Sequence, residues 1–91
     1  MNNILILEYF ANENYKILKF LYDKQIQVKK ECYINLSQQE IADTLQFSKL
    51  KTNKIMQELR EKGFINYGSK RRKYAITTNG YKVIELIQKE W

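Results

Sequence analysis

Hydrophobic and polar residues alternate along this chain with two different periods. In the first part, apolar residues recur at spacings of three and four, which is typical of amphipathic helices. Residues 2–11 therefore predict a short N-terminal helix or arm, and residues 14–24 predict a longer helix, with Asn12 and Asn14 as suitable N-cap residues at the break. The apolar face of the longer helix consists of Ile17, Leu18, Leu21 and Tyr22.

The clearest helix signals lie between residues 37 and 63. Ser37-Gln38-Gln39-Glu40 has the form of a capping box, in which the serine and the glutamate each satisfy a free backbone N–H at the start of a helix. A second start signal, Ser48, follows soon after, and Gly63 is a suitable cap for the end of the next helix, 49–62. The inward faces are Ile41, Ala42 and Leu45 in the first helix, and Ile55, Met56 and Leu59 in the second. Two helices joined by so short a turn predict a helix-turn-helix over residues 37–62.

After Gly63 the period changes to two. Residues 64–67 and 73–77 are rich in aromatic and β-branched residues and predict two strands of a hairpin. The segment between them, Gly68-Ser69-Lys70-Arg71-Arg72, is a turn with a cationic tip. An isolated short strand is predicted at 33–36.

The last helix is predicted over residues 79–91, with Thr78 or Asn79 as its cap. Its apolar face consists of Val83, Ile84 and Ile87. The predicted fold is therefore mainly α with a small β-hairpin wing over residues 64–77, which is a winged helix-turn-helix.

Length and composition exclude several classes of function. With 91 residues the chain suits a single domain over residues 1–91. Histidine is absent, which removes the commonest acid/base group and the usual metal ligand. The single cysteine, Cys32, cannot form an internal disulfide, and we interpret it as a small apolar packing residue rather than a redox sensor. We therefore expect no enzyme activity, no metal and no cofactor.

The charge distribution favours a polyanionic partner. Sixteen Lys and Arg residues against ten Asp and Glu give a formal net charge of +6. No acidic residue occurs from Lys49 to Gln57, whereas Glu58 and Glu61 follow directly. A helix that is merely solvated would mix its signs. Because the major groove of DNA is about 12 Å wide and admits one helix, helix 49–62 is the candidate reader of double-stranded DNA.

Particular side chains suit this role. The candidate DNA-binding residues of the helix are Ser48, Lys49, Leu50, Lys51, Asn53, Lys54 and Gln57, with Thr52 near the boundary of the buried face. Asn53 and Gln57 have the amide geometry for adenine, lysines suit phosphate or guanine, and Leu50 suits a thymine methyl group. The tip residues Lys70, Arg71 and Arg72 suit phosphates or the minor groove. An ordinary charged turn explains this tripeptide equally well in isolation, but its place directly after the reading helix favours DNA.

Several motifs resemble the MarR-like group of bacterial winged-helix regulators. They are Leu36 to Ala42, Phe47-Ser48-Lys49, Glu58 to Ile65, Lys70-Arg71-Arg72 and Ile76 to Gly80. The resemblance covers about half of the chain, residues 36–80, and implies that residues 49–57 lie on the recognition helix and Arg71 and Arg72 on the wing. Gln46 stands where the group commonly has a turn glycine, so it is expected in a left-handed conformation or in a reshaped turn. The wing and the flanking helices are also shorter than is typical of the group.

Function is therefore expected to be sequence-specific binding of double-stranded DNA by a dimeric regulator of transcription, acting as a repressor. The dimer would form through the N- and C-terminal helices. Ile4, Leu5, Leu7, Ile87 and Trp91 are expected either to form the apolar surface shared by the two subunits or, equally, to close the core of the monomer. The longest apolar run, 4–7, is far below the roughly 20 residues that cross a bilayer, so we expect a cytoplasmic protein, at the nucleoid when bound to DNA. One alternative is a plasmid or phage partition or replication-control protein, and another is a winged helix that binds an acidic protein.

Overall fold

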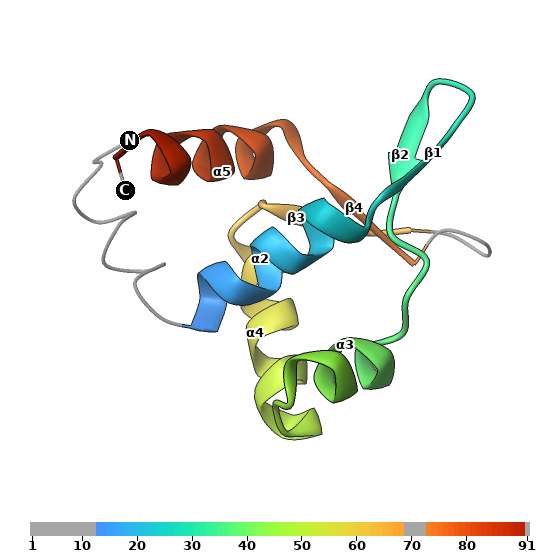
Figure 1. Cartoon of the computed structure of the whole chain (residues 1–91), viewed down its shortest axis with the longest axis vertical. Coiled ribbons are helices and arrows are strands. Elements are labelled where there is room, and N and C mark those ends of the chain that lie inside the picture. Colours follow the sequence, from blue (N-terminus) through green and yellow to red (C-terminus); the bar gives the residue numbers. More distant parts are fainter. Residues whose placement is uncertain (1–12, 69–72, 91) are drawn as a thin grey trace.

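The computed structural model describes residues 13–68 and 73–90. Helices α3 and α4 lie at one end of the molecule and α5 lies at the other, with α2, β3 and β4 between them, and the β1–β2 hairpin projects from one side (Figure 1). In chain order the elements are α2 (Glu13–Lys24), β1 (Ile26–Val28), β2 (Glu31–Tyr33), α3 (Gln38–Leu45), α4 (Lys49–Glu61), β3 (Ile65–Tyr67), β4 (Tyr74–Ile76) and α5 (Thr78–Glu90). The predicted winged helix is therefore confirmed as the architecture.

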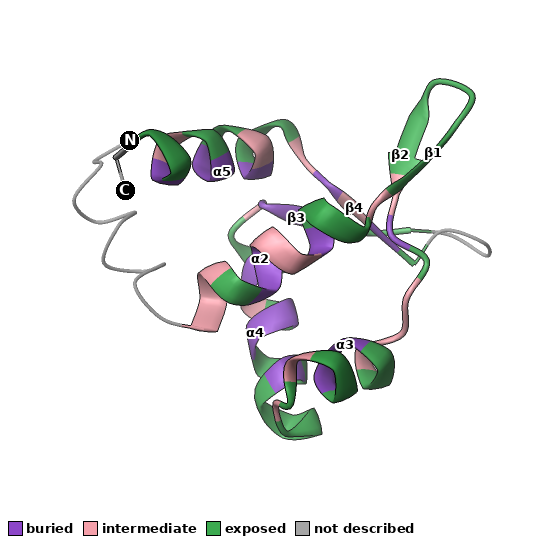
Figure 2. Cartoon of the chain, viewed as in Figure 1, coloured by how far each residue is buried: buried purple, intermediate pink, exposed green. Residues whose placement is uncertain are grey.

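One apolar core joins these elements. The buried sides of the helices turn toward the centre of the molecule, and the exposed sides turn outward (Figure 2). The core is built from the periodic positions that the sequence indicates, because each helix buries only the stripe that recurs at three and four residues. Its fully buried members include Ile17, Leu18, Leu21, Ile41, Met56, Leu59, Ile65 and Ile87.

Capping side chains set the bounds of the helix-turn-helix. The Ser37 hydroxyl accepts a hydrogen bond from the Glu40 N–H at 3.1 Å, and the Glu40 carboxylate accepts one from the Ser37 N–H at 3.2 Å, so the predicted capping box is present. These hydrogen bonds, that from the Ser37 backbone first, hold the pKa of Glu40 below its ordinary value. At the other end of α3, Gln46 adopts the left-handed conformation with φ of 59°, as its place in the turn predicts.

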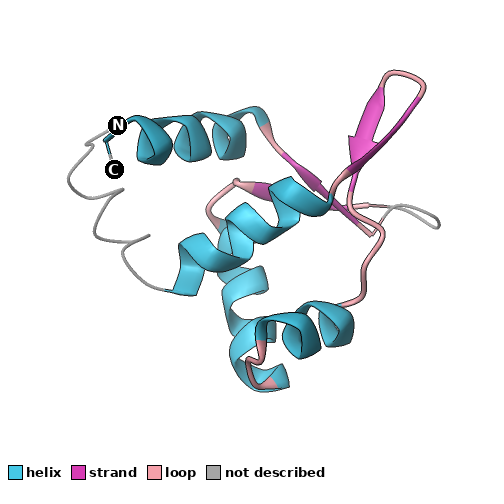
Figure 3. Ribbon diagram, viewed as in Figure 1, coloured by secondary structure: helices cyan, strands magenta, loops and turns pink. Residues whose placement is uncertain are grey.

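Two hairpins lie side by side, and the first of them was not expected (Figure 3). The strand predicted around 33–36 lies two residues earlier, as β2, with a bridge at Ile34 directly after it. It pairs with β1 in an antiparallel hairpin, with Ile26 opposite Tyr33 and Val28 opposite Glu31. Its turn has no glycine, asparagine or proline, and Lys29 supplies the positive φ of 60° instead. Lys29 and Lys30 form the turn of this hairpin.

A backbone bridge links the first hairpin to the wing. Ile34 donates its N–H to the Tyr74 carbonyl at 2.7 Å and accepts the Tyr74 N–H at 3.2 Å. The wing itself pairs Ile65 with Ile76 and Tyr67 with Tyr74. The β-structure between α2 and α3 therefore holds the base of the wing.

The start of α5 is fixed by Thr77, which corrects the expected cap at Thr78 or Asn79. Its hydroxyl accepts the Gly80 N–H at 3.0 Å and donates to the Gly63 carbonyl at 2.6 Å. Thr77 therefore joins the end of α4 to the beginning of α5. Gly80 is required at this junction, because a Cβ there would lie 2.3 Å from the Phe64 carbonyl oxygen.

Candidate nucleic-acid interface

Helix α4 has one buried and one exposed side. Thr52, Ile55, Met56 and Leu59 are buried. Thr52 was predicted near the boundary of the buried face, but the structure places it fully inside. It precedes Ile55 by three residues and Met56 by four, so it belongs to the same buried stripe. The predicted reading residues Lys49, Leu50, Lys51, Asn53, Lys54 and Gln57 are all exposed. Leu50 is 81% exposed, which is unusual for a leucine and leaves it available for contact with a partner.

Ser48 is the N-cap residue of α4. The Ser48 hydroxyl accepts a hydrogen bond from the Lys51 N–H at 3.0 Å, so Ser48 orients the first turn of α4. Because unpaired N–H groups at a helix start attract anions, the same turn suits a phosphate. Among the candidates, Ser48 is the one whose oxygen is already engaged within the helix.

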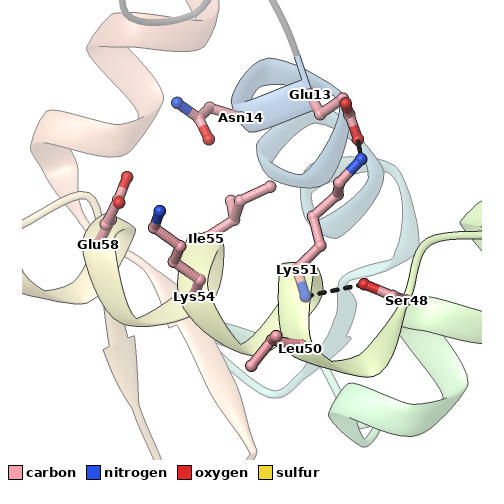
Figure 4. Close-up of a pocket in the computed structure, with 8 residues that line it drawn as sticks. All are labelled: Glu13, Asn14, Ser48, Leu50, Lys51, Lys54, Ile55 and Glu58. Carbon is pink, nitrogen blue, oxygen red and sulfur yellow. Dashed lines mark hydrogen bonds and ion pairs between the residues drawn. The ribbon is translucent and has the colours of Figure 1, made fainter.

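Lys51 has partners that the sequence did not indicate. Its Nζ lies 2.6 Å from the Glu13 carboxylate at the start of α2, and both side chains are about half exposed (Figure 4). The same ammonium group lies 5.4 Å from the centre of the Phe47 ring. Glu13 and Lys51 are 38 residues apart in the chain, so no local pattern could have paired them. Lys51 is thus partly neutralised, whereas Lys49 and Lys54 have no such ion pair among the residues that the structure covers.

Asn53 links α4 to α3. Its amide nitrogen donates a hydrogen bond to the Gln38 side-chain oxygen at 3.0 Å. Arg60, in the last turn of α4, lies over the Tyr67 ring of β3 at 4.5 Å, which ties the helix to the wing. Neither Gln38 nor Arg60 was predicted from the sequence as part of the site.

The remaining predicted site residues belong to the cationic tip of the wing. Lys70, Arg71 and Arg72 fall between β3 and β4, outside the described residues. Lys73, directly before β4, is exposed. The structure therefore describes the candidates on α4 and the two strands, β3 and β4, that flank the tip residues in the sequence.

A pocket of about 430 Å³ lies between the start of α2 and the outer flank of α4 (Figure 4). Its lining includes Glu13, Asn14, Lys51, Lys54, Ile55 and Glu58. Two of these lining side chains, Glu13 and Glu58, are acidic. Within the described ranges no group of three histidine, cysteine or acidic residues could hold a metal ion. None of the described helices has both the length and the hydrophobicity of a membrane span.

Comparison with known proteins gives no match to a family model or to a curated protein sequence. Solved structures do match. A mutant of MepR from S. aureus bound to an oligodeoxyribonucleotide has a TM-score of 0.75 and 25% identity, covering 93% of this chain and 62% of that one. The S. aureus MepR–DNA complex has a TM-score of 0.71 and 27% identity, covering 91% and 59%. MepR is a regulator of the MarR family.

The fold is a MarR-like winged helix. In this winged helix, α3 and α4 are the helix-turn-helix and β3 and β4 are the wing strands. The reduced (FeII) CO-sensing protein from R. rubrum shares the fold at a TM-score of 0.67 and 18% identity, covering 92% of this chain and 40% of that one. The chain spans about three fifths of the length of the MepR structures that it matches.

Proposed function

We propose that this winged helix is a sequence-specific double-stranded DNA-binding protein that regulates transcription and places α4 in the major groove. The observation that carries the proposal is the exposed side of α4, where lysines, amides and an 81% exposed leucine stand opposite a fully buried stripe. The absence of any acidic residue from Lys49 to Gln57 supports it further. Both MepR structures described above contain DNA, and their likeness to this chain includes the helix-turn-helix.

The side chains of α4 divide into two roles. Asn53 and Gln57 carry amides that can pair with the N6 and N7 of adenine, and Leu50 can contact a thymine methyl group. Lys49 and Lys54 provide charges for phosphates, which position the protein without reading sequence. Lys51 contributes less, because Glu13 already balances its charge.

The wing and a second subunit extend this contact. In the proposal, Lys70, Arg71 and Arg72 bind phosphates or the adjacent minor groove, where the negative potential favours arginine. Two copies joined through their N- and C-terminal helices would present two α4 helices to half-sites about one helical turn apart. Such a dimer on a palindrome that overlaps a promoter would act as a repressor.

A salt titration of duplex binding tests the proposal. We expect the logarithm of the binding constant to fall linearly with the logarithm of salt concentration, with a slope of about 0.9 per phosphate contact. Replacing Arg71 and Arg72 with alanine should weaken binding to every duplex and flatten this slope by about 2. Lys16→Ala together with Lys82→Ala removes the same two charges from α2 and α5 and should change the slope little. If the wing variant and the control behaved alike, the wing would have no part in binding.

A further inference from the structure

A continuous set of side-chain contacts leads from α4 to the wing and back again. Asn53 on α4 donates to Gln38, the first residue of α3, at 3.0 Å. Gln38 also interacts with the side chain of Tyr74 on β4, where it lowers the pKa of the hydroxyl. Tyr74 packs edge-on against Tyr67 at 5.3 Å, and Tyr67 lies beneath Arg60 of α4. Gln38 thus stands at the one point in this set where the reading helix, α3 and the wing strand meet.

The chemistry of Gln38 fixes the direction of both of its hydrogen bonds. Its carbonyl oxygen accepts the Asn53 N–H, so its amide nitrogen is the group left to interact with the Tyr74 hydroxyl. Burial raises the pKa of Tyr74, and the Gln38 hydrogen bond opposes that rise by favouring the phenolate. Tyr74 is only 8% exposed, so its ring is a rigid support for the Gln38 side chain. The Gln38 side chain therefore lies between Tyr74 of the wing and Asn53 of α4.

Asn53 keeps the groups that a base requires. A carboxamide has one carbonyl oxygen and two N–H donors, and Gln38 occupies one donor. The remaining N–H and the oxygen form the donor and acceptor pair that matches N7 and N6 of adenine in the major groove. Asn53 is exposed, so this pair is accessible to a duplex.

We infer that Gln38 is a positioning residue for sequence recognition, which fixes the Asn53 carboxamide so that its remaining N–H and its oxygen read one adenine. The inference rests on the proposed function and names the base that one side chain of the site selects. Gln38 acts before binding, because a side chain that is already oriented loses less conformational freedom in the complex. Fixing one such side chain in advance is worth roughly two- to tenfold in affinity.

The test compares base preference among variants by selecting bound duplexes from a random library and sequencing them. The parent should prefer adenine at one position of each half-site, and Asn53→Ala should lose that preference by roughly five- to 100-fold. Gln38→Ala should lower the preference at the same position by roughly two- to tenfold and leave the other positions unchanged. Gln38→Glu keeps an acceptor for Asn53, so it should retain the preference, with weaker binding to all duplexes because it adds a negative charge.

Gln39→Ala is the matched control. Gln39 is the neighbouring glutamine of α3, and its amide donates to Asp43 within the same helix at 2.8 Å. It should keep the adenine preference of the parent. Thermal unfolding of each variant separates a general loss of structure, which would weaken all positions together, from the loss at one position that we expect.

Two results would overturn the inference. In the first, Asn53→Ala loses the adenine preference while Gln38→Ala keeps it in full, which would mean that the hydrogen bond does not orient Asn53. In the second, Gln38→Ala weakens all positions equally together with the unfolding temperature, which would mean that Gln38 only holds α3 against α4. A parent chain that binds no duplex at low salt would instead refute the proposed function itself.

Discussion

At the scale of single residues, side chains of the same type on α4 differ in what surrounds them. Lys51 lies 2.6 Å from Glu13, whereas Lys54, one turn further along, has no ion pair in the described part of the chain. The sequence identified both lysines as candidates because both belong to the outward side of a helix. It could not distinguish them, since their difference depends on α2, which packs across α4 only in the folded chain. Partners of individual side chains are therefore the part of the site that sequence reasoning missed.

This difference predicts unequal effects of two matched substitutions. Lys54→Ala should flatten the salt dependence of duplex binding by about 0.9, because it removes one phosphate contact. Lys51→Ala should have a smaller effect, since its charge is already balanced. Glu13→Gln frees Lys51 and should raise duplex affinity by roughly two- to fivefold, the range of a partly exposed ion pair. The measurement is fluorescence anisotropy of a labelled duplex at several salt concentrations.

The double variant Glu13→Gln with Lys51→Ala is the control for that experiment. It should bind as Lys51→Ala does, because Glu13 acts through Lys51. Equal losses for the two lysine variants, with no gain for Glu13→Gln, would show that the ion pair does not limit Lys51.

At the scale of elements, the helices could be predicted well because their ends carry local signals. Ser37 with Glu40, and Ser48, fix the two helix starts through hydrogen bonds within three residues. The β1–β2 hairpin could not be predicted in the same way. Its turn at Lys29 has a positive φ without a residue that favours it, and its strands are only three residues long. Backbone pairing of Ile34 with Tyr74, 40 residues away, is equally invisible to a local pattern.

The turn of the helix-turn-helix provides a stability prediction at this scale. Gln46 has φ of 59° and ψ of 38°, a conformation that costs a residue with a Cβ about 1 kcal/mol. Gln46→Gly should therefore raise the unfolding temperature by roughly 4–8 °C for a domain of this size. Thr44→Gly, in the helical part of α3, should lower it, because glycine weakens a helix and the hydrogen bond from Thr44 to the Glu40 carbonyl is lost.

Differential scanning calorimetry of both variants measures these changes. A fall in the unfolding temperature for Gln46→Gly would mean that the glutamine side chain has a stabilising role beyond its backbone conformation.

At the scale of the whole molecule, the fold follows from the order of its periodic segments. Two capped helices, a change to period two and a final helix lead to a winged helix, and the structure confirms that architecture. Charged residues are unevenly distributed along this fold. Lysines but no acidic residue occur from Lys49 to Gln57 of α4, whereas Glu13 and Glu58 line the pocket beside α4 together with Lys51 and Lys54. Part of the net charge of +6 thus comes from a stretch of α4 that has no acidic residue of its own.

Methylation interference is the direct test of whether the exposed side of α4 enters the major groove of a duplex. Dimethyl sulfate methylates guanine N7 in the major groove and adenine N3 in the minor groove, so a duplex selected by the chain can be modified in either groove before binding. We expect N7 methylation within each half-site to reduce binding. Undiminished binding to duplexes methylated at N7 throughout the selected sequence would show that α4 does not enter the major groove.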